Sequence, residues 1–210
     1  PTVATERTIA GHSVRTIMAD IHSIGAGGGS IARVDTSGAL HVGPESAGSD
    51  PGPVALKSGG IYPTITDADL TLGYLNPDRY CAGRLSLDLS SARESISRNV
   101  ALPTGTTIEQ AALGMLNLAV QNMASAIRTI TTQRALDPRD FTLVAAGGAG
   151  PVHAGLVAQE LQIPTVLIPA YPAQLSAQGM LFAEYRSDAS QTIASRLDRI
   201  PPKALGDIYS

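Results

Sequence analysis

The chain has 210 residues, of which 43% are hydrophobic and 4% aromatic, with a formal net charge of −3. This length allows one large domain or two small ones with a real core. The composition gives no sign of disorder, and without a basic patch we predict no nucleic-acid partner. The apolar runs stay well below a membrane-spanning length, and residues 1–30 lack the pattern of a secretory signal. We therefore expect no membrane partner.

Cys81 is the only cysteine, so it cannot form an internal disulfide, which fits a reducing, cytoplasmic location. It is either a small buried residue or a catalytic thiol. The chain begins at Pro1 with no initiator methionine and no evident domain start. We expect a piece of a longer polypeptide or a processed subunit.

Turn-forming residues are frequent in the first sixty positions. A weak strand signal at His12–Ile17 precedes a glycine-rich loop at Ile24–Ser30. Strands at Ser30–Asp35 and Ala39–Val42 are predicted to form a hairpin, because a glycine in the turn between them can supply positive φ. Residues 43–60 are dense in Gly, Pro and Ser, which is typical of a functional loop or of a linker between domains.

Three helices are predicted between residues 66 and 134. Thr66–Asp69 has capping-box spacing and opens a short helix that reaches about Tyr74. A second short helix is predicted at Ser90–Asn99. Thr106–Glu109 repeats the capping pattern, and apolar residues then recur every three and four positions to about Arg134. A helix of that length is about 40 Å long, enough to serve as the spine of a domain.

The next segment has the pattern of a βαβ unit. A strand at Thr142–Ala146, a helix at Pro151–Leu161 and a strand at Thr165–Ile168 are predicted, with the two strands parallel. A further helix is predicted at Ala177–Ala183, with small residues on one face.

Two glycine-rich loops are candidate ligand sites. The first βα connection lets bare backbone and the N–H groups of a helix start approach a nucleotide, or else serves only as a tight turn. It consists of Gly147, Gly148, Ala149 and Gly150. The earlier loop could cradle an anion with its N–H groups, or could serve close packing. Its candidates are Gly27, Gly28, Gly29 and Ser30. Neither the Rossmann nor the P-loop fingerprint occurs.

Three side chains are candidates for chemistry. Asp67 and Asp69 lie two apart, so they cannot share one helix face. The spacing favours Asp69 as the capping residue and leaves Asp67 as a solvated carboxylate, a water-mediated Mg²⁺ ligand or a catalytic group. His153 lies in the first helical turn after the glycines, where the helix dipole lowers the pKa of an imidazole. It either hydrogen-bonds a ligand or is a satisfied structural histidine.

Six segments together resemble one family. In chain order they are Ile24–Ala32, Val42–Pro53, Pro63–Gly73, Asp137–Phe141, Gly147–Ala154 and Leu175–Leu181. Their sequences and their order are similar to those of the hydantoinase A/oxoprolinase family. That family includes ATP-dependent oxoprolinases, N-methylhydantoinases, and the ATP-binding subunits of acetone and acetophenone carboxylases.

The resemblance implies an α/β fold, an actin-like ATPase lobe of the sugar kinase and heat-shock chaperone type, incomplete in this chain. It divides the chain into a glycine-loop and hairpin region at residues 1–100, a nucleotide-binding lobe at 101–187 and a polar tail at 188–210. Gly147–Gly150 would be the adenosine-side loop. ATP and Mg²⁺ are the implied cofactors, and the catalytic candidates remain Asp67 and His153.

The implied activity is phosphorylation of a cyclic amide or related carbonyl before hydrolysis. The alternatives are an ATP-binding subunit of a ketone carboxylase and a non-catalytic assembly or nucleotide-binding module. The two phosphate loops of the family do not occur here, so we expect the chain alone to be a poor ATPase. It would need the missing N-terminal part or a hydantoinase B-like partner, and we expect an oligomer. Ala135 and Asp69 stand where many relatives have glycine and asparagine.

Overall fold

A computed structural model describes residues 3–4, 7–9, 11–15 and 18–183. Two compact units follow one another along the chain, Pro1–Leu175 and Ser176–Ser210. The first unit spans the boundary at residue 100 that we expected from the resemblance. The predicted tail at 188–210 lies outside the described residues. Of the second unit, the structure describes the helix α6 (Leu175–Phe182), close to the predicted Ala177–Ala183.

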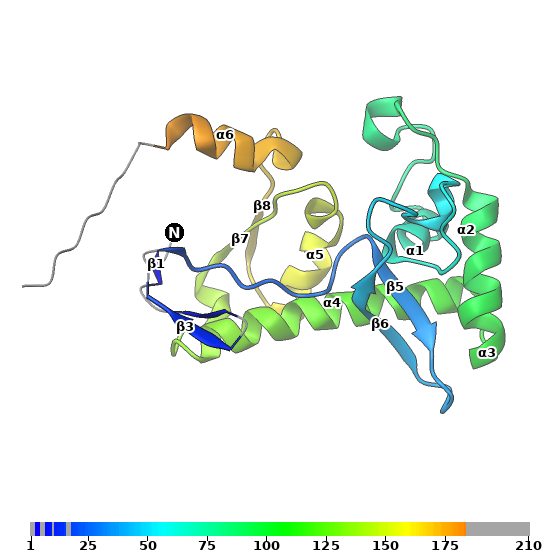
Figure 1. Cartoon of the computed structure of the whole chain (residues 1–210), viewed down its shortest axis with the longest axis horizontal. Helices are drawn as coiled ribbons and strands as arrows, with labels where there is room; N and C mark the ends of the chain where they lie inside the picture. Colours follow the sequence, from blue (N-terminus) through cyan, green and yellow to red (C-terminus); the bar gives the residue numbers. More distant parts are fainter. Residues whose placement is uncertain (1–2, 5–6, 10, 16–17, 184–210) are drawn as a thin grey trace, which may run out of the picture. The chain divides into compact units, whose positions relative to one another are not determined.

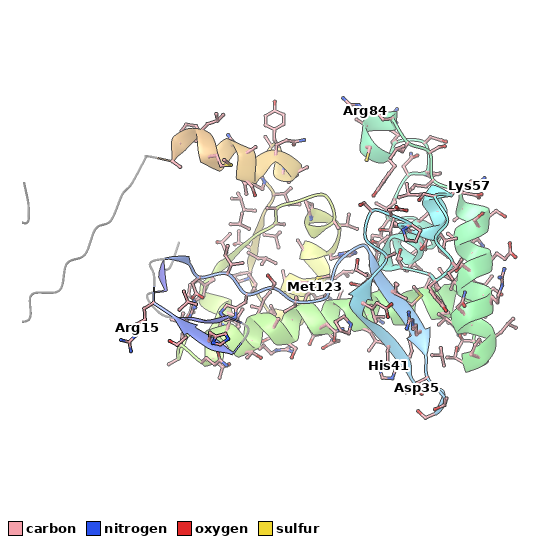
Figure 2. All side chains as sticks on the ribbon, viewed as in Figure 1. Arg15, Asp35, His41, Lys57, Arg84 and Met123 are labelled. Atoms are coloured by element: carbon pink, nitrogen blue, oxygen red, sulfur yellow. The ribbon has the colours of Figure 1, made fainter. Side chains whose placement is uncertain are left out.

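A hairpin with a tight turn follows the first glycine-rich loop. Strand β5 (Ser30–Val34) pairs antiparallel with β6 (Leu40–Ser46), which runs four residues beyond its predicted end at Val42. Asp35 organises the turn, since its carboxylate accepts the N–H groups of Ser37 and Ala39 at 2.8 and 3.0 Å. Nε2 of His41 lies 2.7 Å from the Asp35 carboxylate, and Figure 2 labels both residues near this turn. Hydrogen bonds from Ser37 and from His41 hold the pKa of Asp35 well below its usual range.

Further short strands pair near the start of the chain. Strand β1 (Val3–Ala4) is antiparallel to β4 (Met18–Ala19), and β2 (Arg7–Ile9) is antiparallel to β3 (His12–Val14). The predicted strand at His12–Ile17 therefore contains β3, and its last two residues lie outside the described part of the chain.

Helices follow in the order expected. They are α1 (Ile65–Thr71), α2 (Leu89–Ile96), a π-helical turn at Ser97–Ala101, α3 (Leu102–Thr104) and α4 (Ile108–Thr132). The start of α4 differs from prediction by one residue. Its capping box joins Thr107 and Gln110, and not Thr106 and Glu109. Both capping frames fit the sequence. In the observed frame, Oε1 of Gln110 accepts the Thr107 N–H at 3.1 Å.

The βαβ unit is confirmed. Strand β7 (Thr142–Val144) leads through the glycines to α5 (Gly150–Leu161), and β8 (Thr165–Leu167) then pairs parallel to β7. Short 3₁₀ turns lie at Val54–Leu56, Tyr80–Gly83, Pro138–Asp140 and Pro172–Gln174.

Helix α4 contributes to two hydrophobic clusters, which explains its length. One face of its first half packs with α1, the hairpin and the end of α2, where Met115 and Ile65 are fully buried. Its second half packs against α5, β7 and β8, where Ala124 and Val157 are buried. In Figure 1 the green ribbon of α4 passes both groups of elements. The single helix therefore ties the hairpin region to the βαβ unit.

Candidate functional site

The start of α1 corrects the predicted capping frame. The box joins Thr64 and Asp67, and not Thr66 and Asp69. Asp67 is fully buried and accepts the Thr64 N–H at 2.8 Å and the Thr64 hydroxyl at 2.9 Å. It also accepts the backbone N–H groups of Ala55 and Val54, at 2.8 and 3.3 Å. Burial raises the pKa of Asp67, and these four hydrogen bonds oppose that shift.

This geometry gives Asp67 a structural task. Its two oxygens hold the turn at residues 54–55 onto the start of α1, and its side chain does not line the main cleft. It is not a solvated carboxylate, and a catalytic or Mg²⁺-binding role has no support in its surroundings. Among the residues that the structure describes, no group of three or more His, Cys, Asp or Glu gathers closely enough to hold a metal ion. The described part of the chain therefore gives Mg²⁺ no carboxylate cage.

Asp69 and His153 form a buried pair that the sequence did not predict. Helix α1 carries Asp69, and the first turn of α5 carries His153, with 2% and 1% of each residue exposed. The His153 Nε2 lies 2.9 and 3.1 Å from the two carboxylate oxygens. An ionised carboxylate only accepts hydrogen bonds, and in that state of Asp69 the proton lies on Nε2 of His153. The Nδ1 atom is buried and has no hydrogen-bond partner among the described residues.

The loop at Gly27–Ser30 is closely packed. The Ser30 hydroxyl accepts the Gly27 N–H at 2.9 Å, and the carbonyl of Gly28 accepts both the N–H and the hydroxyl of Thr66 at 2.8 and 3.0 Å. A Cβ at Gly28 would lie 2.8 Å from the Thr66 hydroxyl, and one at Gly29 would lie 2.8 Å from the Ser46 hydroxyl. Close approach of neighbouring chain is therefore one reason for glycine at both positions.

The loop at Gly147–Gly150 has the opposite surroundings. A Cβ placed on Gly147, Gly148 or Gly150 would meet no atom within 4 Å. Gly147 has φ +84°, a conformation suited to glycine, and its N–H donates to the carbonyl of Pro172 at 2.8 Å. Packing by neighbours thus does not account for glycine at 148 and 150. The missing side chains leave open space in front of the N-terminus of α5.

A cleft of about 390 Å³ lies at this open space. Residues from four segments of the first unit line it: Thr66 and Asp69 of α1; Tyr74, Leu75, Asn76, Arg79, Tyr80 and Cys81; Gly148, Ala149 and Val152; and Ala173. Among the described residues that line it, Asp69 and Arg79 are the ones with charged side chains. The cleft brings together Gly148 and Ala149 of the second glycine loop and the carboxylate of Asp69, whereas Gly147, Gly150 and Asp67 do not line it. Ser30 and Gly27 do not line it either.

The segment Tyr74–Cys81 was missed as part of the site. A signal for it existed, because two of the six tyrosines flank Arg79 within seven positions of a chain that has few aromatics. Cys81 is exposed, which corrects the expectation of a small buried residue. Cys81 and Ala82 both have positive φ, 50° and 60°. Burial raises the pKa of Tyr80, and the neighbouring Cys81 adds to that shift.

His153 also lines a second, apolar groove of about 290 Å³ between α4 and the βαβ unit. Its walls include Met123 and Ile127 of α4 and Val144 of β7. The pair Asp69–His153 thus lies between two hollows, with the carboxylate lining the cleft and the imidazole lining the groove.

Within the described residues, no helix is both long and apolar enough to cross a membrane.

Comparison with known proteins agrees with the resemblance seen in the sequence. The caprolactamase subunit alpha of Pseudomonas jessenii is 42% identical over 86% of this chain and 26% of that protein. The acetophenone carboxylase gamma subunit of Aromatoleum aromaticum is 50% identical over 76% of this chain and 22% of that protein. The crystal structure of the ATP-dependent caprolactamase from Pseudomonas jessenii superimposes with a TM-score of 0.78 at 40% identity, covering 84% of this chain and 26% of that one.

The mixed α/β fold therefore matches part of a larger protein of known structure. The chain spans about a quarter of the length of these relatives. Residues 1–189 match the family described as hydantoinase/oxoprolinase. The chain belongs to the hydantoinase/oxoprolinase family.

Proposed function

We propose that this chain supplies the nucleoside end of the ATP site in an enzyme that activates a cyclic amide or related carbonyl compound. The observation that carries the proposal is the cleft at the start of α5, where Gly148 has no neighbour within 4 Å of a would-be Cβ. A solved relative is named as ATP-dependent. ATP would supply a phosphoryl group that turns the amide or carbonyl oxygen into a good leaving group.

The lining residues suit a base and a sugar. Tyr74, Tyr80 and Leu75 offer apolar area to a purine, and the guanidinium of Arg79 can stack on it. The backbone of Gly148 and Ala149 can approach the sugar without side chains in between. Asp69 repels phosphate, so we place the uncharged end of the nucleotide beside it. The single Arg79 is too little positive charge for a triphosphate, and we infer that the phosphates extend toward groups outside the described residues.

Hydrolysis of a cyclic amide is the preferred overall reaction, in line with the caprolactamase relative. The second candidate is ketone carboxylation, which the 50% identity to an acetophenone carboxylase subunit favours. Both relatives are named as subunits, and we infer that this chain also works with a partner subunit, of hydantoinase B type. Nucleotide turnover in the complete assembly, measured against a panel of lactams, hydantoins and ketones, separates the two reactions. Nucleotide binding without turnover on any of them would favour a non-catalytic binding module.

The nucleotide site is tested with Gly148→Val in the complete assembly. The backbone at Gly148 has no positive φ, and the new side chain meets open space, so the protein should fold normally. The branched side chain would occupy the cleft, and we expect ATP affinity measured by calorimetry to fall at least about 100-fold. Gly155→Val is the matched control, because Gly155 is an exposed residue of α5 with open space around it and lies outside the cleft. Equal ATP affinity of the two variants would contradict the assignment.

A further inference from the structure

Helix α1 touches both glycine-rich loops with one face. Thr66 and Asp69 are three residues apart, so their side chains lie on the same side of the helix. Thr66 holds the first loop, since its N–H and its hydroxyl both donate to the carbonyl of Gly28. Asp69 holds the start of α5 through His153, which is 84 positions away in sequence. Each contact joins two segments that are far apart in the sequence, by 38 residues for Thr66 and Gly28 and by 84 for Asp69 and His153.

These two contacts set the distance between the loops. A Cβ built on Gly28 would lie 3.5 Å from the Cβ of Ala149, so the loops are in van der Waals reach of each other. The glycines have no side chains that could bond one loop to the other, so other residues must hold the two loops together. The Asp69–His153 hydrogen bonds are buried, so removing one partner leaves the other buried and unpaired, which destabilises this contact.

We propose that Asp69 and Thr66 are positioning residues: they fix the two glycine loops against each other, and they act on nucleotide binding through those loops. This inference rests on the proposed nucleotide site. Asp69 in this role needs only to accept a hydrogen bond from Nε2 of His153. An asparagine oxygen can accept the same bond without the negative charge.

The test compares Asp69→Ala with Asp69→Asn in the complete assembly. Asp69→Ala leaves the His153 N–H buried and unpaired, and we expect ATP affinity by calorimetry to fall about tenfold or more. Asp69→Asn keeps the acceptor, and we expect ATP affinity within about threefold of the parent protein. An Asn variant that loses as much affinity as the Ala variant would overturn the positioning role and indicate that the charge itself is needed.

Thr66→Val gives a milder second variant in case Asp69→Ala does not fold. Valine keeps the volume, and the backbone N–H of residue 66 still reaches the Gly28 carbonyl. We expect a loss of affinity of a few fold, and in Thr66→Val/Asp69→Ala a combined loss that is not the product of the two single losses. Unchanged ATP affinity in Thr66→Val, with Asp69→Ala either unchanged or unfolded, refutes the proposal.

A partly buried hydrogen bond away from the cleft provides the control for stability. Ser95 is 5% exposed, and its hydroxyl donates to the carbonyl of Ile61. Ser95→Ala should lower the thermal midpoint without changing ATP affinity. A merely structural Asp69 would behave in the same way. If the parent assembly itself binds no ATP, the proposed function fails, and the role of α1 in placing the loops is then decided by crystal structures of the parent and Asp69→Ala, where unchanged loop positions would refute it.

Discussion

Single residues in this chain occupy backbone conformations that the sequence alone does not reveal. Helix α4 ends in a Schellman motif, in which the N–H of Leu136 donates to the Thr131 carbonyl and that of Ala135 to the Thr132 carbonyl. Ala135 has φ +53° in this motif. A glycine would adopt this left-handed conformation more readily than alanine does.

We predict that Ala135→Gly stabilises the protein. The left-handed conformation costs alanine about 1–2 kcal/mol more than glycine, while glycine loses more freedom on folding, so a net gain of about 0.5–1 kcal/mol is expected. Denaturant unfolding at constant m measures it. Gln162 ends α5 in the same conformation, with φ +57°, so Gln162→Gly should give a gain of the same sign. A lower free energy of unfolding in both variants would show that residues 135 and 162 do not have the left-handed conformation described.

Asp69 and His153 show where sequence reasoning ends at this scale. The residue types and the helix start identified His153 as a polar group near a ligand loop. No local pattern connects it with Asp69, because the contact depends on how α1 and α5 pack. The same holds for Asp67, whose backbone donors at residues 54–55 come from a loop with no periodic pattern.

At the scale of elements, helices and strands were predicted well where the sequence pattern was long or allowed only one position for the element's start. The 25 residues of α4 repeat an apolar face many times, and the βαβ unit is marked by apolar runs on either side of glycines. The frames of two capping boxes were wrong. Thr64 and Thr66 each precede an aspartate by three residues, and Thr106 and Thr107 each precede Glu or Gln by three. Tertiary contacts choose between such frames.

Asp88, the N-cap residue of α2, makes the stability of the helix start depend on pH. Its carboxylate accepts the N–H groups of Ser90 and Ser91 at 2.9 and 3.2 Å, and Lys57 lies 2.6 Å away. The hydrogen bond from Lys57, followed by that from the Ser91 hydroxyl, holds the pKa of Asp88 well below its usual value of 3.8. Because the folded pKa is lowered, the stabilisation is complete above the unfolded pKa and is lost as pH falls toward the folded pKa.

We predict that Asp88→Asn lowers the thermal midpoint near neutral pH by a few degrees. Asparagine can still cap the helix, so the fall in thermal midpoint would come mainly from the loss of the ion pair with Lys57. The difference from the parent protein should shrink below about pH 4, because the Asp88 carboxylate of the unfolded chain then binds a proton that the folded protein still excludes. Lys57→Met removes the same pair from the other side and should show the same pH window. A difference that is constant from neutral to acid pH would contradict this explanation.

The whole molecule presents one feature that its own core does not explain. Strands β7 and β8 are parallel, and one face of the pair packs on α4 and α5 through Leu143 and Val166. The residues on the opposite face are exposed, with Leu167 at 53% and Val144, which also lines the apolar groove beside α4, at 51%. Parallel sheets in proteins are usually covered on both faces. The composition gave no hint of this asymmetry, because both faces carry apolar residues.

We therefore predict that residues 1–210 expressed alone bind a hydrophobic dye such as ANS and self-associate. Replacing Val144 and Leu167 together with lysine should reduce both the dye fluorescence and the sedimentation coefficient, because the charges oppose burial of this face. Ile61→Lys is the control, since Ile61 is 69% exposed but lies outside the sheet. A monomeric parent chain with no dye binding would mean that the exposed face of β7 and β8 does not drive association. The expectation of oligomers would then lose its physical basis.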